Sequence, residues 1–259
     1  RFIYTSYACI DKRGMHKACL DVQKGMRKMK RKYNNYYILK MDIAKFFQNI
    51  DKDILYNILK KDIQDKKVLW LIKEVIYSNV KDKECKKLNE NKNKDKDQEN
   101  IDTSVKSLPI GNYTSQIFAN VYLNELDKYV KEELRCKFYY RYMDDEVILL
   151  ESKEKAIEIL NKITLFLKEK LKLELNSKTQ IFKSKQGVNF CGYKIKENKL
   201  KIREKGKRKL KKKIKYLKYM TRIGKMTCKE ARKYLCGHIG YIQIADIHGL
   251  INNLFYLEG

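Results

Sequence analysis

The stretch YYRYMDDEVILL, residues 139–150, carries two adjacent acids between two short apolar runs. Residues 138–143 and 147–150 have the pattern of β-strands, which predicts a hairpin with Asp144 and Asp145 at its tip. Adjacent carboxylates repel each other, and the flanking apolar residues draw them toward a packed sheet. A divalent cation resolves that conflict, and hard carboxylate oxygens suit Mg²⁺. An isolated Asp-Asp pair is more often a simple turn than a metal site, so the assignment depends on the surrounding sequence.

A third acid lies at the end of another predicted strand. Residues 36–43 alternate in polarity, so that Lys40 and Asp42 point to one face and the apolar residues to the other. Acids on two neighbouring strands are what two-metal phosphoryl transfer needs. Two ions about 3.5–4 Å apart clamp the attacking and leaving oxygens of the displacement.

The rest of the pattern predicts a mixed chain. A helix is expected after Asp51, whose side chain can cap it. Further helices are expected over residues 68–76, 114–134 and 156–171, and short strands over 173–175, 181–182 and 190–195. This order favours an α+β core followed by a smaller helical domain.

Two segments differ from this core in composition. Residues 81–106 are rich in Lys, Asp, Asn and Glu and bury too little apolar surface to offset their ordering entropy, so we expect a flexible surface insertion. Residues 196–218 include thirteen basic and two acidic residues, with Leu210, Ile214 and Leu217 at helical spacing. One face of such a helix can pack while the other presents a basic ridge.

The composition points to a polyanionic partner. The 259 residues include 59 Lys and Arg against 32 Asp and Glu, a formal net charge of +27. We find no apolar run of about 18 residues and no secretory signal, and therefore expect no membrane association. Seven scattered cysteines without a CxxC pair fit a reducing cytoplasm. The chain begins at Arg1 rather than Met, which is compatible with a missing N-terminal segment.

Five motifs occur in register along the chain. They are YYILKMDIAKFF (36–47), LPIGNYTSQIFANVYLNELD (108–127), YYRYMDDEVILL (139–150), LNSKT (175–179) and NFCGYKI (189–195). Together they resemble the palm motifs of reverse transcriptases from bacteria and retroelements. The resemblance implies an RNA-directed DNA polymerase, a nucleotidyltransferase, with the right-hand fold. It implies fingers at 1–36, a palm at 37–195 that includes the remaining fingers helices, and a basic helical thumb at 196–259.

The resemblance also implies a catalytic set. Asp42, Asp144 and Asp145 match the metal-binding acids, and Ile43 completes the metal set. The implied cofactor is a pair of Mg²⁺ ions, for which Mn²⁺ can substitute. Lys178 matches the lysine that approaches the triphosphate and protonates pyrophosphate. The alternative for Lys178 is an ordinary solvated surface lysine.

Further positions match nucleotide and primer contacts. Arg13 loosely matches the basic fingers segment that holds the triphosphate. Phe47 matches the aromatic steric gate that selects deoxynucleotides, with core packing beside Phe46 as the alternative. The implied nucleotide-binding set is Arg13, Phe47, Ile110, Gly111, Gln116 and Lys178. Phe190, Gly192 and Tyr193 match the hairpin that grips the primer end, and they are the implied primer grip.

The motif IGNYTSQ, residues 110–116, is informative within the superfamily. Most reverse transcriptases have Gln before this Gly and Pro at the end of the motif, whereas Ile110 and Gln116 stand here. The pattern resembles the reverse transcriptases of diversity-generating retroelements, bacterial or phage-encoded, which copy a template RNA with errors concentrated at adenines. The implied partners are an RNA template, a DNA or RNA primer, the RNA/DNA duplex, dNTPs and a small basic accessory subunit.

One position departs from the family. Glu146 follows the paired acids where an apolar residue is usual, and strand alternation predicts that it points away from the metals to solvent. The alternative is that Glu146 adds negative charge near the site. Two other readings of the chain stay open. One is a defence-associated or group II intron-like bacterial reverse transcriptase. The other is a catalytically silent nucleic-acid-binding module, although such a module has no use for three acids at its centre.

Overall fold

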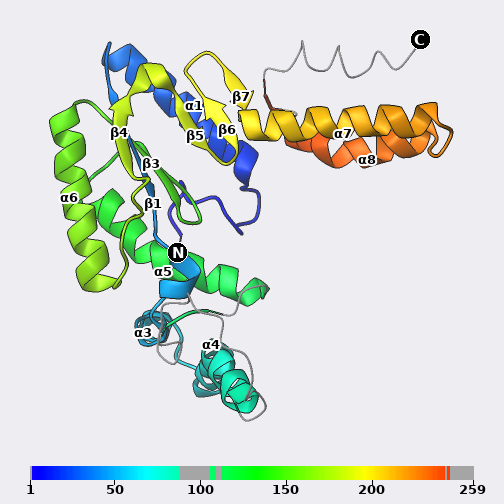
Figure 1. Ribbon diagram of the computed structural model, residues 1–259. Helices are drawn as coiled ribbons and strands as arrows, with labels where there is room; N and C mark the ends of the chain where they lie inside the picture. Colours follow the sequence, from blue (N-terminus) through cyan, green and yellow to red (C-terminus); the bar gives the residue numbers. More distant parts are fainter. Residues whose placement is uncertain (1, 88–105, 109–111, 243, 246–259) are drawn as a thin grey trace.

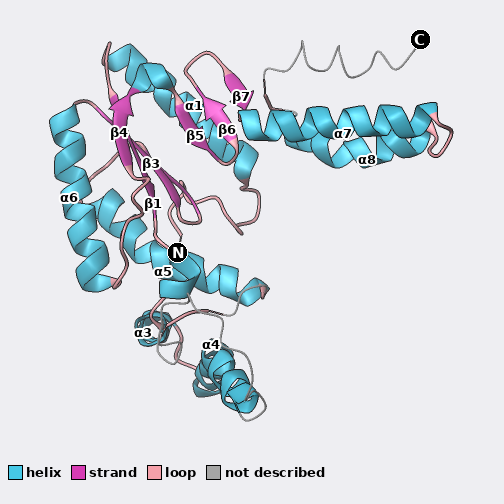
Figure 2. Ribbon diagram, viewed as in Figure 1, coloured by secondary structure: helices cyan, strands magenta, loops and turns pink. Residues whose placement is uncertain are grey.

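The computed structural model describes residues 2–87, 106–108, 112–242 and 244–245, and Figures 1 and 2 show their arrangement. The helices are α1 (Met15–Lys32), α2 (Phe46–Asn49), α3 (Lys52–Asp62), α4 (Lys66–Lys87), α5 (Tyr113–Lys128), the π-helical turn η1 (Tyr129–Glu133), α6 (Lys153–Lys170), the 3-10 turn η2 (Ser184–Gln186), α7 (Glu204–Arg222) and α8 (Cys228–Ile242). The strands are β1 (Tyr37–Asp42), β2 (Tyr139–Tyr142), β3 (Asp145–Leu150), β4 (Gln180–Lys183), β5 (Val188–Phe190), β6 (Tyr193–Ile195) and β7 (Leu200–Ile202). The predicted α+β class is confirmed.

The central sheet has the strand order β2-β3-β1-β4, and all its pairs are antiparallel. The hairpin of β2 and β3 and the strand β1 lie where the alternating pattern predicts them. Successive side chains of a strand point to opposite faces. Each strand of this sheet therefore contributes to two separate apolar layers.

The two faces of the sheet are covered by different elements. Leu39, Met41 and Ile148 point into a core shared with α3, α5 and α6. Ile38 and Val147 point into a second core shared with α1 and with the smaller sheet of β5, β6 and β7. Both faces of the central strands are thus packed, and the acids described below lie on the second face, towards α1 and the smaller sheet.

The smaller sheet corrects the prediction for residues 190–195. They do not form one strand, because the chain reverses at Cys191 (φ 47°) and Gly192 (φ 84°) between β5 and β6. Glycine adopts such a φ at little cost. The basic segment begins with β7 and continues as α7, which pairs with α8 in an arm that extends from the body of the molecule (Figure 1).

The helix after Asp51 forms as predicted. The carboxylate of Asp51 accepts hydrogen bonds from the amides of Asp53 (3.1 Å) and Ile54 (3.0 Å), which are donors without helical partners. The flexible insertion predicted over 81–106 is wrong at both ends. Helix α4 continues to residue 87, and Lys106 forms an isolated β-bridge with Asp51. The remainder, 88–105, lies outside the described residues.

Two other predicted elements end differently. The helix predicted over 114–134 becomes the π-helical turn η1 after residue 128, where the amide of Leu134 bonds the carbonyl of Tyr129 at 2.9 Å. The strand predicted over 173–175 is absent from the described elements, and only Leu175 forms a bridge, to Ile43. None of the helices in the described residues is long and apolar enough to cross a membrane.

Helix α1 packs on the sheet at a glycine. A Cβ atom added to Gly25 would overlap the hydroxyl of Tyr140, with the Tyr140 ring carbon Cζ at 3.0 Å and Leu149 Cδ1 at 3.3 Å. Both neighbours are buried strand residues. The close approach of α1 to β2 and β3 therefore requires glycine at this position.

We expect Gly25→Ala to lower the free energy of unfolding by about 1–3 kcal/mol, because the added methyl overpacks this contact. Denaturant unfolding followed by circular dichroism measures the change. Gly240→Ala is the matched control, since nothing lies within 4 Å of its added Cβ in α8. That control should be neutral or stabilising by up to about 1 kcal/mol. Equal effects of the two changes would contradict the packing argument.

Candidate active site

The acids singled out in the sequence lie on neighbouring strands. Asp42 at the end of β1 is the direct cross-strand partner of Asp145, the first residue of β3. Asp145 in turn pairs with Tyr142 of β2, so Met143 and Asp144 alone form the turn of the hairpin. The two-residue turn is thus shifted by one position from the predicted Asp144-Asp145 tip, and Asp145 belongs to the ladder.

Strand alternation sorts the charged residues onto two faces. Lys40, Asp42 and Asp145 share the face covered by α1 and the smaller sheet. The Lys40 ammonium pairs with the carboxylate of Asp145 diagonally across the strands, and it lies 5.7 Å from the centre of the Phe190 ring. Lys40 is not among the residues predicted for the site, although its alternation with Asp42 in the strand predicts that both side chains point to this face.

Burial sets the electrostatics of this face. Burial raises the pKa of Asp144, and the charge of Asp42 adds to the rise. Burial lowers the pKa of Lys40 to about 8, although the charge of Asp42 acts in the opposite direction. A carboxylate whose ionisation is disfavoured by burial and by a neighbouring negative charge is a place where a cation is favoured.

The donor set suits a site with few protein ligands. In the part of the chain that the structure describes, no group of three or more His, Cys, Asp or Glu could hold a metal ion. Asp145 is turned to Lys40, which leaves Asp42 and Asp144 as the interacting pair. Mg²⁺ usually binds through one or two carboxylates together with water and substrate phosphates. The residues present fit that mode.

Glu146 corrects a prediction. It points away from Asp42 and Asp145, as alternation requires, but it is fully buried rather than exposed to solvent, because α5 covers that face. Both of its carboxylate oxygens lack a hydrogen-bond partner among the residues that the structure describes. Burial raises its pKa to about 8, against the charge of its cross-strand neighbour Arg141.

The segment LNSKT is anchored beside β1. The amide of Asn176 donates to the carbonyl of Asp42 at 2.7 Å, and the Asn176 side chain accepts from the amide of Lys178 at 3.1 Å. The Lys178 side chain is exposed. This turn therefore presents a lysine next to the end of the strand that carries Asp42.

The predicted nucleotide-binding residues come from several elements. Phe46 is 3% exposed, whereas Phe47 is only partly buried, so Phe47 is the ring that reaches the surface. The amide of Leu108 bonds the carbonyl of Phe47 at 3.0 Å. Gln116 is exposed and accepts a hydrogen bond from the thiol of Cys9 at 3.0 Å. Ile110 and Gly111 lie outside the described residues.

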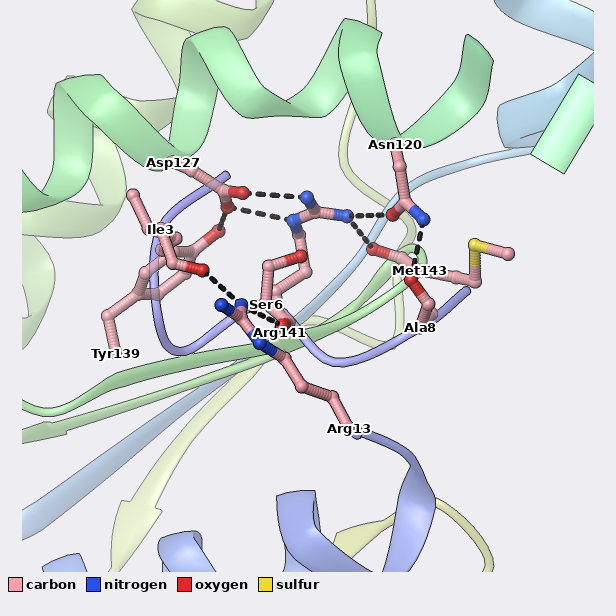
Figure 3. A network of polar contacts seen from close by, with 9 residues as sticks. All are labelled: Ile3, Ser6, Ala8, Arg13, Asn120, Asp127, Tyr139, Arg141 and Met143. Carbon is pink, nitrogen blue, oxygen red and sulfur yellow. Dashed lines mark hydrogen bonds and ion pairs between the residues drawn. The ribbon is translucent and has the colours of Figure 1, made fainter. Parts of the chain in front are cut away.

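Arg13 is engaged by the protein itself. Its Nη1 donates to the carbonyls of Ile3 (2.6 Å) and Ser6 (2.8 Å), as Figure 3 shows, and its guanidinium lies over the ring of Tyr4 at 5.4 Å. These contacts hold the N-terminal segment in place. They give Arg13 a structural role in addition to the predicted contact with the triphosphate.

The hairpin predicted to grip the primer turns its aromatic side chains inward. Phe190 and Tyr193 are 1% and 0% exposed. The carbonyl of Gly192 accepts from the amide of Arg203 at 3.1 Å, and the carbonyl of Phe190 accepts from the Cys19 thiol at 3.7 Å. The rings therefore support the turn, and only its backbone and Cys191 reach the surface.

An antiparallel sheet backed by helices and followed by a helical arm is the arrangement of the right-hand polymerase class. Residues 1–195 match the reverse transcriptase (RNA-dependent DNA polymerase) family. The chain belongs to this family, and its enzyme class is therefore RNA-directed DNA polymerase.

Solved structures confirm the predicted right-hand fold. Apo telomerase from Candida tropicalis, truncated from its C-terminal domain, aligns with a TM-score of 0.51 at 16% identity, over 76% of this chain and 41% of that chain. Telomerase from Candida albicans in complex with a TWJ fragment of telomeric RNA aligns with a TM-score of 0.53 at 12% identity, over 77% and 35%. Identities this low show the fold alone.

A curated relative is the COX1/OXI3 intron 2 protein of Saccharomyces cerevisiae. It is 26% identical over 220 residues, which cover 63% of this chain and 24% of the yeast protein. The chain spans about a quarter of that relative and less than half of the telomerase chains.

We expect Glu146→Leu to raise the free energy of unfolding by about 1–3 kcal/mol, because the change removes a buried carboxyl group without hydrogen-bond partners. Denaturant unfolding at neutral pH measures the difference. Glu169→Leu in α6 is the control, since Glu169 is exposed. A loss of stability in Glu146→Leu would show that the carboxyl group contributes an interaction with Arg141 that outweighs its burial.

Proposed function

We propose that this chain is the catalytic part of an RNA-directed DNA polymerase that extends a DNA or RNA primer on an RNA template. The observation that carries the proposal is the cross-strand pairing of Asp42 with Asp145, with Asp144 in the adjoining turn, inside the region that matches the family. A binding surface for nucleic acid alone would not concentrate carboxylates where phosphates have to approach.

The acids would hold divalent metal. Asp42 and Asp144 supply carboxylates, and Ile43, whose side chain is apolar, can contribute only its backbone carbonyl. Mg²⁺ supplies positive charge that activates the primer 3′-hydroxyl and neutralises the triphosphate, and Mn²⁺ is expected to substitute. Asp145 stays paired with Lys40 in the arrangement seen here, which places one more cation next to the reacting phosphates.

Other residues would orient the substrates. Lys178, presented beside the end of β1, is proposed to approach the triphosphate and protonate pyrophosphate. Phe47 is proposed as the steric gate against a ribose 2′-hydroxyl, which its partial exposure allows. Gln116, Ile110 and Gly111 complete the proposed nucleotide pocket. Arg13 fits the triphosphate role less well, because its guanidinium already bonds backbone carbonyls.

We propose domain boundaries on the same basis. Residues 1–36 and the helices α3 and α4 form the fingers, 37–195 contain the palm, and 196–259 form the thumb. The thumb helix α7 buries Leu210 and Leu217 and leaves most of its basic residues exposed. Exposed Lys and Arg bind a duplex through its phosphates. The backbone of the turn at Cys191 and Gly192 is proposed to contact the primer end.

Primer extension tests the function. The purified chain, a DNA primer on an RNA template, dNTPs and Mg²⁺ are expected to give template-dependent products. Asp144→Asn should lower the extension rate at least about 100-fold, because metal stabilisation of the transition state contributes several kcal/mol. Asp62→Asn, a change of an exposed acid in α3, should leave the rate unchanged.

The outcomes separate the enzyme from a binding module. Equal extension by wild type and Asp144→Asn would contradict the assigned metal site. Retained RNA binding without extension by the wild-type chain, in Mg²⁺ and in Mn²⁺, would contradict the proposed activity and support the silent nucleic-acid-binding module. Circular dichroism of each variant confirms that it is folded.

We further propose the diversity-generating type, with a template RNA and a small basic accessory subunit as partners. The support is the motif of residues 110–116, in which Ile110 stands where a Gln is usual. A Gln near the incoming nucleotide can hydrogen-bond it and penalise poor geometry, and Ile cannot. Discrimination against mispairs should therefore be loose in this chain.

Ile110→Gln should reduce errors opposite template adenine by about 3–10-fold. This is the discrimination that one added hydrogen bond, worth about 0.5–1.5 kcal/mol, would supply. Sequencing of the extension products measures the error spectrum. Ile117→Gln, the same change at an exposed position of α5, is the control and should leave the spectrum as in wild type. An unchanged error spectrum in Ile110→Gln would contradict the proposal that the missing Gln causes the loose discrimination.

The similarity to the yeast intron 2 protein favours a second candidate, an intron-type reverse transcriptase. This candidate and a defence-associated enzyme share the proposed chemistry and differ in fidelity. Wild-type products without an excess of errors at adenine would favour them over the diversity-generating type.

A further inference from the structure

A buried arginine lies beneath the turn that carries Asp144. Arg141 of β2 is fully buried, as is its ion-pair partner Asp127. Its Nε and Nη2 donate to the two oxygens of Asp127 at 2.7 Å and 2.6 Å, a two-point ion pair shown in Figure 3. Its Nη1 donates to the side-chain carbonyl of Asn120 at 2.9 Å and to the backbone carbonyl of Met143 at 3.2 Å.

The partners of Arg141 are themselves fixed. Asn120 and Asp127 are seven residues apart, two turns on one face of α5. Asp127 also accepts from the hydroxyl of Tyr139 at 2.7 Å, and the side-chain Nδ2 of Asn120 donates to the carbonyl of Ala8 at 2.7 Å. The guanidinium is therefore held by a helix, which is itself joined to the N-terminal segment.

The contact with Met143 bears on Asp144 directly. The Met143 carbonyl belongs to the peptide bond that joins Met143 to Asp144. Met143 has a φ of 54°, a left-handed conformation that costs a residue with a side chain roughly 1–2 kcal/mol. Such a conformation persists only where its surroundings hold it.

We infer that Arg141 is a positioning residue, which fixes the Met143–Asp144 peptide and so directs the Asp144 carboxylate toward Asp42. The inference rests on the proposed function only in taking Asp144 as a metal ligand. Through Asp127 and Asn120, α5 becomes the support against which the turn is held. Loss of a residue that orients a metal ligand in this way typically lowers metal affinity or activity by about 10–100-fold.

Fold stability alone does not explain the ion pair between Arg141 and Asp127. Replacement of a buried ion pair by apolar residues often leaves stability unchanged or raises it. Lysine keeps the charge of Arg141 but lacks the planar fork that reaches Asp127, Asn120 and Met143 together. Arg141→Lys therefore separates charge from positioning.

The test compares Arg141→Lys with Arg27→Lys. Arg27 is an exposed arginine that also donates to a backbone carbonyl, that of Glu197 at 2.8 Å, away from the turn. Three quantities are measured for each: amide hydrogen exchange of residues 143–145, affinity for Mn²⁺ from electron paramagnetic resonance of the free ion, and kcat and KM of primer extension. The double variant Arg141→Met with Asp127→Leu serves if Arg141→Lys does not fold.

The expected result for Arg141→Lys is faster exchange in the turn by at least about 10-fold, Mn²⁺ affinity and kcat lower by about 10–100-fold, and a KM for dNTP close to wild type. Arg27→Lys should match wild type in all three. The folded double variant should loosen the turn in the same way, since it keeps an apolar core and removes the hydrogen bond to Met143.

Wild-type exchange in the turn of Arg141→Lys, or of the double variant, would overturn the inference, even if thermal stability falls. Exchange requires neither metal nor substrate, so it decides about Arg141 independently of the proposed activity. A wild-type chain that neither binds Mn²⁺ nor extends a primer would contradict the proposed function, while loosened exchange in the variant would still support the positioning role.

Discussion

The antiparallel register between β1 and β3 is the constraint on which the rest of the structure depends. It places Asp42 opposite Asp145 and Met41 opposite Glu146. A slip of one residue would exchange the faces of every side chain in β1, which would move Asp42 into the core under α5. Because both faces of the sheet are packed, that slip would bury a charge and expose an apolar row at the same time. The packing of apolar residues therefore sets the geometry of the acids.

The two faces of the central sheet have different roles, one carrying the acids of the site and the other supporting them. One face carries Asp42, Asp145 and Lys40 next to the smaller sheet. These side chains are partly buried, so their charges are less screened by water but can still be reached by a substrate. The other face holds Arg141 and Glu146 in a dry layer under α5. Interactions are stronger in that layer because the local dielectric is low. Rigidity on one face thus supports chemistry on the other.

Much of this could be predicted from alternation and spacing. The strand around Asp42 and the acidic hairpin carry the period of two, and the cap at Asp51 has a local cause. The burial of Glu146 could not be predicted, because a pattern of faces does not show which face a distant helix covers. The turn at Cys191 could not be read from alternation, since both strands around it are too short to show a period, and only the family resemblance implied a hairpin there. The pairing of Lys40 required the register of two strands far apart in sequence.

The N-terminal segment gives the sheet a protection of another kind. β2 is an edge strand, and an open edge invites pairing with a second chain. Here the amide of Arg141 bonds the carbonyl of Thr5 at 3.0 Å, and the amide of Tyr7 bonds the carbonyl of Arg141 at 3.1 Å, so the edge is occupied at its midpoint. Displacement of a few residues at the beginning of the chain would uncover a template for aggregation. The same segment thus protects the sheet edge against edge-to-edge association and contributes the fully buried Tyr7 to the apolar core.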